Sequence, residues 1–230
     1  MHATARLTNK PLQQSHKSND SKFTLTEIQQ IEKMAISRTF EKKQYIYYPQ
    51  EPSKAVYYLK EGRVKIGTYS NDGKEVIKSI IYPGQLFGEL GLIGEEQRSD
   101  FAKSLNEPIR VVVININDMR VLMNEDMRLN LKVMTQIGNR LRKVERRLES
   151  LIFKSARARI VDLLKDMAIE RGLKVGYEVL LRHFFSHREI AAMTGTSRQT
   201  VTKVLSELKR SNLIHTDRKN ILIRDLTKLE

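Results

Sequence analysis

The sequence contains no cysteine, and this absence removes several kinds of site from consideration. Disulfides, thiolate zinc sites and cysteine-ligated iron–sulfur clusters all require cysteine sulfur. Long apolar runs are missing too, since none approaches the roughly 20 residues of a membrane-spanning helix. The N-terminal residues lack the apolar core of a secretion signal. We therefore expect a soluble, cytoplasmic protein with no membrane partner and no iron–sulfur cofactor.

Catalytic and metal-ligand patterns are also scarce. The sequence shows no paired carboxylates at catalytic spacing, no Walker loop and no nucleophile–base set, so we expect no enzyme. The five histidines all lie before residue 17 or after residue 182, which leaves the middle of the chain without an axial ligand for haem. His183 and His187 are four residues apart, but a predicted helix cap at Ser186 separates them and no third ligand is near. We predict no metal site.

Positive charge is what the chain has in excess. Its formal net charge is +14 and its sequence pI is about 9.9. Such a surplus suits a polyanionic partner, because binding to DNA releases the counterions condensed on the phosphates. A basic pI is also found in RNA-binding and membrane-surface proteins, so the charge supports a DNA partner without selecting it.

Residues 186–210 have the pattern of two short helices around a tight turn. Ser186 and Glu189 form a Ser-x-x-Glu capping box for the first helix, and Gly195 stands where the chain must bend sharply. Ser197 is the predicted N-cap of a second helix, whose opposite face carries side chains that reach base edges and phosphates. We predict a helix-turn-helix that binds double-stranded DNA. The predicted DNA contacts are His187, Ser197, Arg198, Gln199, Thr202 and Lys203.

The spacing of apolar residues divides the rest of the chain. A short amphipathic helix is predicted from residue 24 to residue 37. From residue 40 to about residue 115 the apolar period is two, and turn signals recur, as in a small barrel or sandwich. A hairpin over residues 213–224 predicts a wing. The expected organisation is α+β: a flexible tail (1–21), a β-domain (22–126), a dimerisation helix (127–154) and a winged helix-turn-helix (155–230).

The predicted long helix, residues 127–153, carries an apolar seam. Its apolar residues recur seven apart in two interleaved series, while its other faces are heavily charged. This pattern favours a coiled-coil homodimer, although packing of the stripe on its own domain remains an alternative. The predicted dimer seam is Met134, Ile137, Leu141, Val144, Leu148 and Leu151.

The stretch 84–99 is a glycine-rich loop with one arginine. Glycines free backbone N–H groups for close approach to an anion, Glu89 can accept from hydroxyls, and Arg98 offers a fork for a phosphate. The sequence Phe-Gly-Glu-Leu followed by Arg98-Ser99 resembles the phosphate-binding cassette of cyclic-nucleotide-binding domains. With the long helix and the winged helix-turn-helix, the chain from about residue 23 resembles the family of the cyclic-AMP receptor protein and the fumarate–nitrate reduction regulator (the CRP/FNR family).

The resemblance implies a homodimeric bacterial transcription regulator with a β-roll effector domain. It places Gly88 and Glu89 against a ribose, and Arg98 and Ser99 against a cyclic phosphate. It also places the loop 170–176 where family members contact RNA polymerase, a third expected partner.

One departure from the family bears on the effector. Members that bind cyclic AMP use a Thr-Ser pair on the dimer helix, and Val144 and Glu145 stand at those positions here. Valine neither donates nor accepts, which counts against cyclic AMP. A cyclic nucleotide and an empty pocket, or one for an unrelated effector, remain alternatives. In the empty pocket Glu89 would pair with Arg98. If an anionic nucleotide binds instead, Arg98→Ala should abolish its binding with only a small effect on the fold.

The recognition helix predicts a changed operator. Members that bind cyclic AMP open this helix with Arg-Glu and place an arginine one turn later, whereas this chain has Arg198, Gln199 and Lys203. Arginine reads guanine, while glutamine suits adenine. We expect an inverted repeat that keeps the guanine and differs at the Gln199 position. A non-specific architectural DNA-binding protein is the alternative, but its task needs no β-domain.

Overall fold

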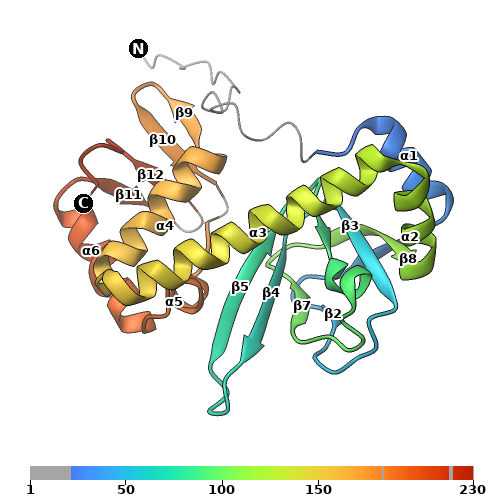
Figure 1. Cartoon of the computed structure of the whole chain (residues 1–230). Helices are drawn as coiled ribbons and strands as arrows, with labels where there is room; N and C mark the ends of the chain where they lie inside the picture. Colours follow the sequence, from blue (N-terminus) through green and yellow to red (C-terminus); the bar gives the residue numbers. More distant parts are fainter. Residues whose placement is uncertain (1–21, 183, 218–219, 230) are drawn as a thin grey trace. The chain divides into compact units, whose positions relative to one another are not determined.

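The structure, a computed structural model, describes residues 22–182, 184–217 and 220–229. Internal contacts divide the chain into two units, and the division falls between Arg146 and Arg147. Both residues belong to the long helix α3 (Met127–Phe153), which is labelled in Figure 1. The N-terminal turns of α3 therefore belong with the β-strands, and its last turns belong with the C-terminal helices. The tail predicted for residues 1–21 lies outside the described residues.

The first unit is built from two antiparallel four-stranded sheets (Figure 1). One sheet has the order β1-β8-β3-β6, and the other has the order β2-β7-β4-β5. The strands are β1 (Ile36–Phe40), β2 (Tyr45–Tyr47), β3 (Ala55–Glu61), β4 (Val64–Tyr69), β5 (Glu75–Ile81), β6 (Leu86–Phe87), β7 (Phe101–Ser104) and β8 (Ile109–Asn115).

The sheet that contains β8 is covered on both faces. This burial explains why the sequence of strand β8 is nearly all apolar. Val111 points into the core between the two sheets, with Leu59 and Phe87. Its neighbour Val112 points the other way, into a core completed by helices. Because successive side chains of a strand face opposite sides, a strand buried on both faces needs apolar residues at every position.

Three helices close the outer face of this sheet: α1 (Leu25–Lys33), α2 (Ile116–Glu125) and the first turns of α3. Thr24 and Glu27 form a capping box at the start of α1. The prediction that this helix continues to residue 37 is wrong. It ends at Lys33, because residues 36–40 pair with β8 in antiparallel register from Ile36 to Phe40. Sheet pairing overrides the local helical pattern there.

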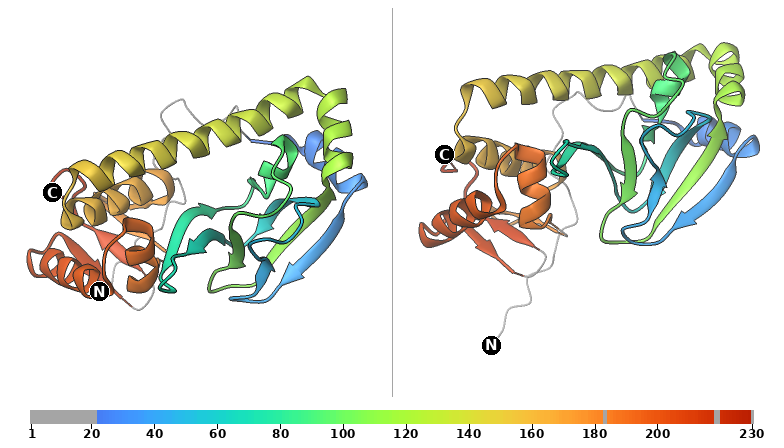
Figure 2. Two further views of the ribbon diagram at one scale, coloured as in Figure 1. Left: turned by 60° about the horizontal axis from the view of Figure 1, so that its bottom comes forward. Right: turned by 90° about the horizontal axis from the view of Figure 1, so that it is seen from below.

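The second unit combines helices α4 (Ala156–Arg171), α5 (His187–Thr194) and α6 (Arg198–Arg210) with a small antiparallel sheet. The helices contact one another, and α4 and α6 also contact the sheet through β10 and β11 (Figure 2). The sheet order is β11-β12-β10-β9, from strands β9 (Leu173–Val175), β10 (Glu178–Leu181), β11 (Ile214–Thr216) and β12 (Ile221–Ile223). The β11–β12 hairpin is the predicted wing.

Within the first unit, the 3-10 helix η1 (Glu89–Ile93) carries part of the glycine-rich loop. Gly88 and Gly94 flank it in left-handed conformations, with φ of 74° and 108°. These angles are costly for residues with a Cβ, so glycine is needed at both ends of this turn.

Candidate nucleic-acid interface and effector pocket

The helix-turn-helix prediction is confirmed in its local detail. Ser186 and Glu189 make the reciprocal capping box of α5, and the Oγ of Ser197 accepts from the backbone N–H of Thr200 at 3.0 Å. Gly195 ends α5 with a φ of 61°. The residues Val201, Val204, Leu205 and Leu208 are buried, so one face of α6 is committed to the core.

The opposite face of α6 is open. Arg198, Gln199, Thr202 and Lys203 are all exposed, at the N-terminal half of a helix whose first N–H groups point outward. His187 stands beside them, with its Nδ1 2.8 Å from the Oγ1 of Thr202. Burial, and secondly the charge of Arg198, lower the pKa of His187. The exposed face of the N-terminal half of α6 is therefore rich in hydrogen-bond donors and in positive charge.

Arg159 of α4 holds the turn in place, a role that the sequence analysis missed. Its Nε donates to the carbonyl of Thr194 at 2.8 Å, and its two terminal nitrogens donate to Gly195 and Lys154 at 3.2 and 2.8 Å. Three main-chain carbonyls are thereby gathered by one guanidinium. The contact joins residues 35 positions apart, so no local pattern indicates it.

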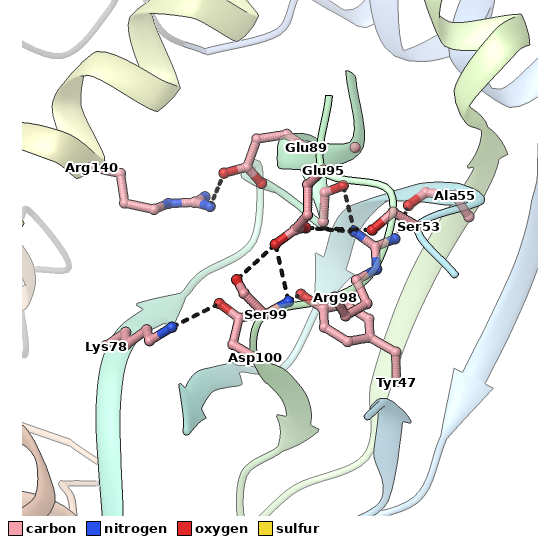
Figure 3. Close-up of polar contacts among 12 residues, drawn as sticks. Tyr47, Ser53, Ala55, Lys78, Glu89, Glu95, Arg98, Ser99, Asp100 and Arg140 are labelled. Carbon is pink, nitrogen blue, oxygen red and sulfur yellow. Dashed lines mark hydrogen bonds and ion pairs between the residues drawn. The ribbon is translucent and has the colours of Figure 1, made fainter. Parts of the chain in front are cut away.

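The second candidate site is the cluster of polar and charged side chains beside the glycine-rich loop (Figure 3). Arg98 lies inside it and is only 3% exposed. One terminal nitrogen donates to the carbonyl of Gly88 at 2.8 Å, the other donates to the carbonyl of Ala55, and the guanidinium lies 4.5 Å from the ring centre of Tyr47. Arg98→Ala would remove a donor from each of these two carbonyls, so we now expect the substitution to lower the stability of the fold.

Glu89 does not pair with Arg98. Its carboxylate forms an ion pair with Arg140 of α3, and the same guanidinium donates to the carbonyl of Leu86 at 2.7 Å. The side chain of Glu89 is buried, and its Oε2 has no hydrogen-bond partner. The predicted Glu89–Arg98 pair is thus replaced by a pair between Glu89 and Arg140, which is 51 residues further along the chain. Only the fold brings these two residues together.

Two further carboxylates, Glu95 and Asp100, belong to this cluster. Glu95 accepts from the backbone N–H of Ser99 at 3.0 Å and from its Oγ at 2.7 Å. Asp100 is buried beside Tyr47, whose hydroxyl donates to it at 3.5 Å, and it lies 3.8 Å from the Nζ of Lys78. Burial raises the pKa of Asp100. Gly88, Glu89, Arg98 and Ser99, the four predicted effector contacts, are therefore close together but already engaged with neighbouring groups.

The predicted seam lies along α3. Met134, Leu141, Val144, Leu148 and Leu151 are each 46–58% exposed, which is unusual for large apolar residues on one helix face. Ile137 is partly buried against the core of the β-domain. Met127 and Leu131 extend the exposed stripe toward the start of the helix.

Neither a membrane span nor a metal cluster is found in the part of the chain that the structure describes. No helix there is long and apolar enough to cross a membrane. Likewise, residues 22–182, 184–217 and 220–229 bring together no group of three or more histidine, aspartate or glutamate side chains that could hold a metal ion.

Comparisons with known proteins agree with this architecture. A sequence model of the cyclic nucleotide-binding domain matches residues 37–126, and one of the Crp-like helix-turn-helix domain matches residues 158–230. The CRP-like cAMP-activated global transcriptional regulator of Mycobacterium tuberculosis is 28% identical over 209 residues, which are 87% of this chain and 93% of that protein.

Solved structures show the same fold. A CRP/FNR-family transcriptional regulator from Thermus thermophilus matches with a TM-score of 0.68 and 26% identity, over 84% of this chain and 96% of that chain. The c-di-GMP responsive global regulator CLP of Xanthomonas campestris matches with a TM-score of 0.75 and 22% identity, over 87% and 99%.

The open face of α6 and the attached β-domain define a DNA-binding transcription regulator. The chain belongs to the CRP/FNR family of such regulators, and this family consists of transcription factors rather than enzymes. The absence of cysteine excludes a cysteine-ligated iron–sulfur cluster as its cofactor.

Proposed function

We propose that this protein is a homodimer that binds an inverted repeat in double-stranded DNA, with one α6 helix in each major groove. The observation that carries the proposal is the open polar face of α6, a helix whose first turn is capped by the side chain of Ser197. Arg198 and Gln199 stand at the first two positions of the helix, where recognition helices contact base edges. We assign Ser197 and His187 to phosphate contacts, which set the position of a protein on DNA.

The dimer is supported by the exposed stripe on α3. Five large apolar side chains at heptad spacing would lose their contact with water if a second α3 packed against them in parallel. A two-fold axis along this seam would present two α6 helices to DNA. Two recognition helices related by a two-fold axis require two DNA half-sites about one turn of the DNA helix apart.

Contact with RNA polymerase is proposed for the β9–β10 hairpin. Its turn holds Gly176, with a φ of 62°, and Tyr177, whose side chain is fully exposed. An exposed aromatic residue at the tip of a hairpin is available to a protein partner. The hairpin overlaps the loop 170–176, which the family resemblance implies as the polymerase contact.

For the β-domain we propose that DNA binding does not depend on cyclic AMP. The M. tuberculosis relative is named as activated by cyclic AMP, and the X. campestris regulator is named as responsive to c-di-GMP, so relatives differ in effector. In this chain the main contacts of Arg98 are main-chain carbonyls, and Val144 stands where cyclic-AMP-binding members have a hydroxyl.

Selection of binding sites from a random pool, without added nucleotide, tests the proposal. Recovery of an inverted repeat whose half-site keeps a guanine but differs at the Gln199 position is the expected result. Binding to the selected duplex and to a random duplex over a series of salt concentrations separates this function from architectural binding. Salt weakens the binding of both duplexes, but only a sequence-specific protein continues to prefer the selected duplex. Equal binding to both duplexes at every salt concentration would contradict sequence-specific recognition.

A further inference from the structure

The carboxylate of Glu95 sits among the groups that the sequence assigns to an effector phosphate (Figure 3). Its Oε1 accepts from both the backbone N–H and the Oγ of Ser99, at 3.0 and 2.7 Å. Its Oε2 accepts from the Oγ of Ser53 at 3.4 Å and lies 3.8 Å from a terminal nitrogen of Arg98. One side chain thus collects a backbone amide, two hydroxyls and a guanidinium.

This donor set is the one that recognises an anion. Phosphates and carboxylates bind to the same groups, namely backbone N–H, serine hydroxyls and arginine, because each presents several strong acceptor oxygens with negative charge. A phosphate placed against Arg98 and Ser99 would meet an oxygen of Glu95 already bonded to Ser99. The two anions compete for the same hydrogens, and their charges repel each other.

We propose that Glu95 is a built-in anion that occupies the donors of Arg98 and Ser99, here called the phosphate corner, and thereby excludes cyclic nucleotides. Glu95 is then the residue that determines which ligands the β-domain accepts: neutral or cationic molecules remain admissible, and anionic ones do not. The inference rests on the proposed assignment of Arg98 and Ser99 as the phosphate corner. It gives a physical reason for the proposal that DNA binding does not depend on cyclic AMP.

The surroundings of the corner reinforce the exclusion. Glu89 and Asp100 add two more carboxylates, and both are buried. Arg140 is already engaged with Glu89, and Lys78 lies 3.8 Å from Asp100. A phosphate beside Arg98 and Ser99 would therefore face three carboxylates, and the nearest cations of two of them, Arg140 and Lys78, already lie against those carboxylates. Like charges at such short range repel each other.

Removal of the Glu95 carboxylate tests the proposal on the intact protein. Binding of cyclic AMP, cyclic GMP and inorganic phosphate is measured by titration calorimetry and by the shift in melting temperature. We expect no binding to the wild type at millimolar ligand, whereas Glu95→Ala should bind at least one cyclic nucleotide at least about tenfold more tightly. Glu95→Gln, which keeps the side-chain shape without its charge, should gain binding as well.

Glu96→Ala is the matched control, because Glu96 is an exposed carboxylate next in the loop whose contact with Ser53 uses only its main-chain carbonyl. It should leave nucleotide affinity at the wild-type level. Wild-type protein that binds a cyclic nucleotide as tightly as Glu95→Ala would overturn the proposal, and so would failure of both folded Glu95 variants to bind. Neither result depends on DNA, so failure of the DNA-binding proposal would be seen separately, in the site selection.

Discussion

Arg140 of α3 and Glu89 of η1 form an ion pair between residues 51 positions apart in the chain. The carboxylate is buried, whereas the guanidinium keeps about a quarter of its side-chain surface in contact with solvent. The pair attaches the glycine-rich loop to the helix that carries the proposed dimer seam. Any ligand that moves Glu89 would therefore act directly on α3.

Arg140→Ala should lower the free energy of unfolding of the β-domain by roughly 2–4 kcal/mol, because it leaves a buried carboxylate without its cation. Urea unfolding followed by tyrosine fluorescence measures this, since the chain contains no tryptophan. In a Glu89→Gln background the same substitution should cost much less. Arg142→Ala is the control, because Arg142 is exposed and its hydrogen bond is to the nearby Asn139 side chain. Equal losses for the two arginines would contradict the pairing as a source of stability.

Leu148→Lys should dissociate the dimer. The substitution would place an unpaired charge in the seam between two helices, at a cost of about 3 kcal/mol or more. Sedimentation velocity over a range of concentrations checks the oligomeric state. Arg146→Glu, which changes a charge on the far side of the same helix, should leave the dimer intact. If Leu148→Lys still sediments as a dimer, the seam lies elsewhere.

Arg198→Ala should weaken binding to the selected operator by roughly 1–3 kcal/mol and relax the preference at one base pair, because a bidentate contact to guanine is lost. Fluorescence anisotropy with operators substituted one base pair at a time measures both effects. Lys209→Ala removes a positive charge from the last turn of α6 and should leave the base preference unchanged. A uniform loss on all sequences with Arg198→Ala would show that Arg198 contacts phosphate instead.

Acid should destabilise the DNA-binding unit through His187. Burial, and secondly the charge of Arg198, lower the pKa of this residue below its ordinary value of 6.5, so the unfolded chain takes up the proton first as the pH falls. The contribution of neutral His187 is present above that value and is lost below it. His187→Gln should accordingly lose less stability than the wild type between about pH 7.5 and pH 5.5, as followed by melting temperature. Parallel pH profiles for the two proteins would rule out His187 as the titrating group.

The sequence alone determined the features whose causes are local. A capping box needs two residues three apart, a helix C-cap needs one glycine, and the two faces of α6 follow from the helical period. The long helix α3 was predicted over the residues it occupies for the same reason. The family motifs are also local patterns, so the class of protein could be inferred before any tertiary contact was known.

Only the tertiary structure decided which partners Arg98, Glu89 and Glu95 contact. Residues 36–40 became a strand because β8 offered a pairing edge, and no pattern within the segment indicated it. Arg140 reaches Glu89 from a helix far along the chain, and Arg98 turns inward to the carbonyls of Gly88 and Ala55. Glu95 occupies the phosphate corner because the loop folds back on Ser99. Spacing shows which groups a loop carries, but whether those groups face a ligand or one another depends on long-range packing.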